Sequence, residues 1–158
     1  MYKRYQGDFK GKSYIRNFRD LQVYQKAHKL STEIMKKIIP NINETDYPSK
    51  SKLSESCLNI PKLIKDAYEM HFDNRSAAET ALKNIMNLSE DVIIYLEQVR
   101  DIFTDKIDAN ICNELIKEYT FNRVKILNLK KSLQKFDAQD NKNIVKPPTN
   151  PGNVNKTY

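Results

Sequence analysis

Two clusters of basic side chains are the candidate functional residues of this sequence. The first lies in residues 1–16, where aromatic rings are interleaved with basic residues and Asp8 is the single acid. Its basic members are Lys3, Arg4, Lys10, Lys12 and Arg16. The second lies between Thr120 and Phe136, an interval without an acid. Its members are Arg123, Lys125, Lys130, Lys131 and Lys135. Basic groups neutralise phosphates and aromatic rings stack on unpaired bases, so the two clusters together predict nucleic-acid binding.

The second cluster has an alternative interpretation, a solvated helix face whose cations interact with the helix dipole. The formal net charge of +7, from 27 Lys and Arg against 20 Asp and Glu, favours nucleic acid. Arg123 and Lys130 are seven residues apart, so we expect them to point the same way on a helix, with Lys131 widening the strip. A membrane surface is a poorer match, because the basic stretches lack a broad apolar face.

Catalytic and metal-binding constellations are missing from the sequence. His28 and His71 are far apart and stand in no metal-ligand motif, and no glycine-rich phosphate loop occurs between residues 17 and 136. Cys57 and Cys112 fall on apolar stripes, where a thiol acts as a small hydrophobe. The sequence therefore predicts a protein that is not an enzyme and that holds no metal or cofactor.

Long helices must position the second basic cluster, because no glycine falls between Asn17 and Phe136. Apolar residues recur there every three or four positions in four segments, at about 17–40, 49–71, 76–99 and 107–136. Asn17 is a plausible N-cap of the first, and Ser76 with Glu79 fits a capping box for the third. The prediction is an all-α fold, an antiparallel up-down four-helix bundle over residues 17–136.

The two ends of the chain differ from this middle. Residues 1–16 are predicted to form a basic and aromatic N-terminal arm, and residues 137–158, rich in Asn and Pro, a flexible tail. The sequence lacks an N-terminal signal peptide and an apolar run long enough to span a bilayer, so we expect a cytoplasmic protein.

Several apolar residues fall off the main stripes. They are Val23, Leu30, Leu63, Tyr68, Ile93, Ile94, Val124 and Leu127. Either they form a second apolar face that drives self-association, which is the favoured interpretation, or they widen the core of helices that pack on two neighbours.

Two stretches resemble a known superfamily. Phe18–Ala27 (FRDLQVYQKA) resembles the opening of the four-helix bundle proteins encoded in ribosomal-RNA intervening sequences. Avd, the accessory variability determinant of diversity-generating retroelements, belongs to the same superfamily. Ile60–Tyr68 (IPKLIKDAY) is similar to a motif of the intervening-sequence branch, but Leu63 and Lys65 replace its Asn and Ala. Residues 63–68 are closer to the Leu-Ile-x-Ala-Tyr pattern of the Avd branch, which the resemblance therefore favours.

The resemblance implies a homopentameric barrel with a basic surface. An Avd-like protein would bind a reverse transcriptase together with structured RNA or an RNA/DNA hybrid, and would support mutagenic cDNA synthesis without catalytic residues of its own. Two alternatives remain open, an intervening-sequence protein of the ribosomal-RNA branch and a helical scaffold that binds only proteins.

Overall fold

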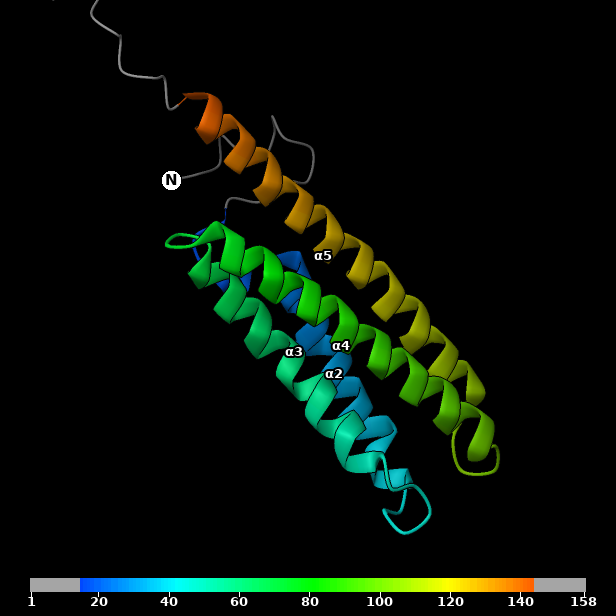
Figure 1. Ribbon diagram of the computed structural model, residues 1–158. Coiled ribbons are helices and arrows are strands. Elements are labelled where there is room, and N and C mark those ends of the chain that lie inside the picture. Colours follow the sequence, from blue (N-terminus) through cyan, green and yellow to red (C-terminus); the bar gives the residue numbers. More distant parts are fainter. Residues whose placement is uncertain (1–14, 144–158) are drawn as a thin grey trace, which may run out of the picture.

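Four long helices make up most of the part of the chain that this computed structural model describes (Figure 1). The structure describes the backbone of residues 15–143 and the side chains of residues 15–134. The helices are α2 (Gln22–Lys37), α3 (Lys50–Met70), α4 (Arg75–Ile102) and α5 (Ala109–Asn143). Residues 15–143 contain no strand, which confirms the prediction of an all-helical chain with four helices. Most of the predicted N-terminal arm and of the predicted tail lies outside the described residues.

The four helices pack side by side around one core. Helix α2 contacts α3 and α5, and α4 contacts the same two helices, so the contacts close into a ring (Figure 1). The core is built from the apolar stripes that recur along each helix. Its fully buried members include Ala27, Ile34, Leu53, Ile60, Ile64, Ile85, Leu96, Leu115 and Ile126. None of the helices in the described part of the chain combines the length and the apolar character needed to cross a membrane.

The first helix begins later than the sequence predicts. Asn17 does act as a cap, but of a short 3-10 turn, η1 (Phe18–Asp20), where its Oδ1 accepts from the Arg19 amide at 2.8 Å. Leu21 then adopts an extended conformation, with φ −68° and ψ 125°, and buries its side chain. This extended residue separates the turn from α2, which starts at Gln22.

The cap of α4 also differs from the prediction. Asn74 occupies the N-cap with an extended backbone, and its Oδ1 accepts from the Ala77 amide at 3.0 Å. Ser76 lies inside the first turn, so it cannot serve as the N-cap of the predicted capping box with Glu79. The N-cap of α4 therefore lies two residues earlier in the sequence than the predicted capping box placed it.

Replacement of Asn74 by Ala is expected to lower the free energy of unfolding by about 1 kcal/mol, because the Ala77 amide loses its acceptor. Ser76→Ala is the matched control and should change the stability by less than about 0.5 kcal/mol. Urea denaturation of the two variants measures both values. A larger loss for Ser76→Ala than for Asn74→Ala would contradict this assignment of the cap.

Most of the apolar residues outside the main stripes belong to the core of the single bundle. Val23 and Leu30 are buried. Four others are half-buried against the core, namely Leu63, Tyr68, Ile93 and Leu127. Ile94 and Val124 are exposed at 43% and 49%. The widened core therefore accounts for six of the eight residues, and an apolar contact between copies would depend on exposed side chains such as Ile94.

Helix α5 continues past Phe136, the predicted end of the bundle, to Asn143. The extra residues contain no Pro or Gly, and the first proline that follows is Pro147. A strong helix breaker is therefore missing where the bundle was predicted to end.

Candidate nucleic-acid interface

The ten basic residues predicted as a nucleic-acid site are only partly within the described side chains. Arg16, Arg123, Lys125, Lys130 and Lys131 are described. Lys3, Arg4, Lys10, Lys12 and Lys135 lie outside the described side chains. The structure therefore bears chiefly on the cluster of α5.

Arg123 points from α5 toward α4. Its Nε lies 3.1 Å from Glu90 Oε2 and donates to the Met86 carbonyl at 3.3 Å. The guanidinium is thus held by a carboxylate and a backbone oxygen of the neighbouring helix. Lys130, two turns further along α5, has the same helical register and is half-buried. Arg123 contributes to the packing of α5 on α4, and its charge is already partly compensated.

Lys125 lies on the other side of α5, toward α2. It lines an open groove of about 390 Å³ between the two helices. The groove is lined by Gln22, Gln25, Lys26, Lys29 and Lys125. Every lining residue is a cation or an amide, and the groove contains no carboxylate among its lining residues. Its side chains can donate hydrogen bonds to an anion, with three ammonium groups among them.

Two contacts hold α5 against α2 beside this groove. Asn122 is buried, and its Nδ2 donates to the Val23 carbonyl at 3.1 Å. One turn earlier, Glu118 forms an ion pair with Lys26 at 2.6 Å. Both contacts join α2 to the part of α5 that carries Lys125.

Glu118 shows how strongly positive its surroundings are. The hydrogen bond from Lys26 is the main cause that lowers the pKa of the Glu118 carboxyl. The charges of Lys117 and Lys29 lower that pKa further. Three lysines, Lys26, Lys29 and Lys117, thus act on one carboxylate that is already paired. We call these three lysines, together with Lys125 of the groove, the α2–α5 basic face.

Sequence reasoning predicted one member of this face, Lys125, and missed the other three. A signal for two of them was present, since Lys26 and Lys29 lie one turn apart beside the apolar stripe of the first helix. That signal was weak because Lys36, Lys37 and Glu33 share the helix. Only the packing of α2 on α5 distinguishes Lys26 and Lys29 from the other lysines.

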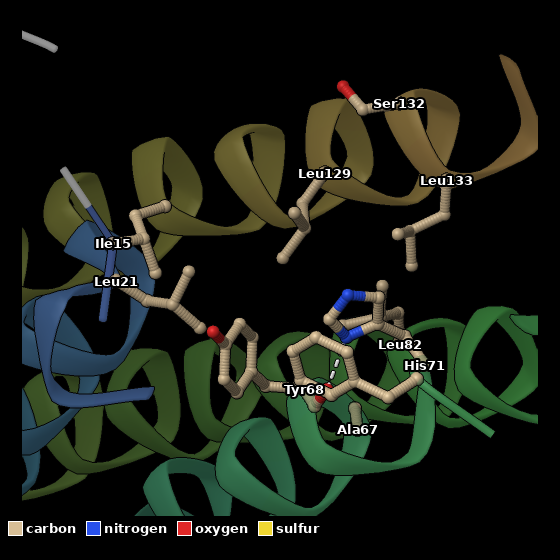
Figure 2. A pocket seen from close by; sticks show the side chains of 10 residues that line it. Ile15, Leu21, Ala67, Tyr68, His71, Leu82, Leu129, Ser132 and Leu133 are labelled. Atoms are coloured by element: carbon tan, nitrogen blue, oxygen red, sulfur yellow. Dashed lines mark hydrogen bonds between the residues drawn. The ribbon is translucent and has the colours of Figure 1, made fainter. Parts of the chain in front are cut away.

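A second concave site, an apolar pocket of about 260 Å³, lies where the end of α3 faces α4 and α5 (Figure 2). Figure 2 shows Leu129 and Leu133 projecting from α5 toward the rings of Tyr68 and His71. Leu129 is half-buried at this pocket and packs against the core. The lining is almost entirely apolar, so the pocket offers hydrophobic contact.

The polar groups at the pocket do not form a nucleophile and base pair. Ser132 points away from the cavity in Figure 2, and its Oγ donates to the Asn128 carbonyl at 3.0 Å. The Nδ1 atom of His71 contacts the Tyr68 carbonyl.

Among the described side chains, no group of three His, Cys, Asp or Glu could hold a metal ion. Cys57 is fully buried, and burial raises the pKa of its thiol to about 12, so it is protonated at neutral pH.

No family model, no curated protein and no solved structure matches this chain. The functional interpretation therefore depends on the geometry and the charge of the two sites. The α2–α5 basic face has ammonium groups, which suit an anionic ligand. The pocket is lined mainly by apolar side chains, which suit an apolar ligand.

Proposed function

We propose that this protein is a non-enzymatic nucleic-acid-binding protein and that its α2–α5 basic face binds the phosphate backbone of RNA. The observation that carries the proposal is the convergence of Lys26, Lys29 and Lys125 from two helices on one groove. Glu118, an acid of α5 beside this groove, is already paired with Lys26. Lysines in such a cluster repel one another, and phosphates relieve that repulsion while releasing counterions.

Our more specific proposal is an Avd-like accessory protein of a retroelement. The resemblance of Phe18–Ala27 and Ile60–Tyr68 supports it. In this proposal the helices form an antiparallel up-down bundle, and the protein acts in the cytoplasm beside a reverse transcriptase and its structured RNA or RNA/DNA hybrid. A reverse transcriptase gene beside this one would support the proposal, and a ribosomal-RNA operon would support the intervening-sequence alternative.

A homopentamer is part of the same proposal. Exposed apolar side chains, among them Ile94 and Ile102, are available for contacts between copies. Five copies of a chain with net charge +7 would repeat the α2–α5 basic face around a ring, so weak phosphate contacts would add by multivalency. A mass near 18.5 kDa in light scattering, that of one chain, would contradict this assembly.

The test of RNA binding neutralises three lysines of the face, Lys29→Gln, Lys117→Gln and Lys125→Gln, and leaves the Lys26–Glu118 ion pair intact. We expect affinity for a structured RNA to fall roughly tenfold or more, because three ammonium groups that attract phosphates are replaced by neutral amides. The slope of log affinity against log salt should become shallower by about 1 for each lysine that binds a phosphate in the wild-type protein. Fluorescence anisotropy at several salt concentrations measures both quantities.

A matched control removes the same charge from α3 and α4 through Lys52→Gln, Lys62→Gln and Lys83→Gln, three exposed positions. This control should keep the wild-type salt slope, and both variants should keep the wild-type helical content and mass. Equal losses of affinity in the two variants would show that net charge alone attracts RNA. Unchanged binding in the first variant would overturn the proposal that the α2–α5 basic face is the RNA site.

A further inference from the structure

Phe121 is a large aromatic side chain that the core of the bundle does not use. It lies on α5 and is 54% exposed, and Val124, one turn further, is 49% exposed. The neighbouring apolar residues of α5, Tyr119 and Ile126, are fully buried. Phe121 therefore stands on the solvent side of a helix whose opposite side supplies the core.

The surroundings of Phe121 are positively charged. The Nζ of Lys117 lies 6.0 Å from the centre of the ring. Lys125 is one turn beyond Phe121, so the ring lies between two lysines on one side of the helix, with about 5–6 Å between successive positions. Glu118 is the nearest acid along the helix, and its charge is compensated by Lys26 at 2.6 Å. Glu114 lies a further turn away.

We propose that Phe121 is a stacking platform for an unpaired base of single-stranded nucleic acid, with the adjoining phosphates on Lys117 and Lys125. This inference rests on the proposed function and specifies the form of nucleic acid that the face selects. A single strand presents planar apolar bases and charged phosphates in alternation, as this side of α5 presents a ring between two ammonium groups. A duplex keeps its bases stacked inside and offers the ring no partner.

The charges also argue against a protein as the occupant of this surface. An apolar protein partner that covered Phe121 and Val124 would have to desolvate Lys117 and Lys125 without pairing them. A single strand covers the ring and pairs the ammonium groups at once.

The first experiment compares Phe121→Ala with wild type, using a labelled short oligouridylate and an RNA duplex of equal length. Loss of the ring is expected to weaken binding of the oligouridylate roughly 5- to 150-fold, which corresponds to the range found for base–aromatic stacking. Duplex binding and the salt slope should stay at the wild-type values, because the ring contacts no phosphate. Phe121→Tyr should restore binding, and Leu58→Ala, at an exposed position on α3, should leave it unchanged.

The second experiment uses the fact that the chain contains no tryptophan. Phe121→Trp places a single indole at the site, and its fluorescence should change on addition of oligouridylate and stay constant on addition of duplex. Leu58→Trp supplies the control indole, which should respond to neither probe.

The outcomes separate this inference from the proposed function. If neutralisation of Lys29, Lys117 and Lys125 weakens binding but Phe121→Ala does not, the basic face stands and the stacking platform is overturned. If neither substitution weakens binding, both fall. If Phe121→Ala lowers the oligomer mass, Phe121 is a contact between copies, which also overturns the stacking proposal.

Discussion

Ile64→Ala is expected to lower the free energy of unfolding by about 2–5 kcal/mol, the cost of truncating a well-packed core residue. Ile64 is 1% exposed and faces the shared core from the C-terminal half of α3. The substitution removes buried methyl groups and leaves a cavity that rigid neighbouring helices cannot fill. Urea denaturation followed by circular dichroism measures the change.

Leu58→Ala is the matched control on the same helix, because Leu58 is 50% exposed. Its expected effect is less than about 0.5 kcal/mol. Similar losses of stability for the two variants would mean that α3 does not present Ile64 to the core. An altered denaturant slope for Ile64→Ala would indicate a change in compactness as well as a loss of packing.

A fall in stability at alkaline pH is the second large expected effect. Burial raises the pKa of the Cys57 thiol from 9.0 to about 12. The unfolded chain therefore releases this proton at a lower pH than the folded chain does. Stability from this group is complete below pH 9 and is lost as pH rises toward 12, by about 4 kcal/mol in all.

Cys57→Ala should flatten this dependence by up to about 1.4 kcal/mol per pH unit between pH 9 and 12. The comparison is between slopes, because the cavity left by the substitution lowers stability at every pH. Part of the slope should remain, since burial also raises the pKa values of Cys112, Tyr47 and Tyr119. Urea melts in a reducing buffer across this range give the slopes, and identical slopes for wild type and variant would contradict the prediction.

The helices and the main apolar stripe of each could be predicted from local patterns of residues. The interval without glycine and the recurrence of apolar residues every three or four positions are local properties of the chain, so they do not depend on which helices become neighbours. Cys57 and Cys112 were placed on apolar stripes for this reason, and both are buried in the structure. Helix starts were less predictable, because Asn74 and Ser76 are both good caps and the path of the chain selects between them.

The packing of the helices, which no local pattern reveals, brings basic residues together on one surface. Arg123 and Lys125 are two residues apart, so their side chains leave α5 in widely different directions. Arg123 meets Glu90 of α4, whereas Lys125 meets Lys26 and Lys29 of α2, which are distant in the sequence. The neighbours of α5 on its two sides cannot be read directly from the sequence. That choice follows from the mutual packing of four stripes, and it places Lys26 and Lys29 beside Lys125 at the groove.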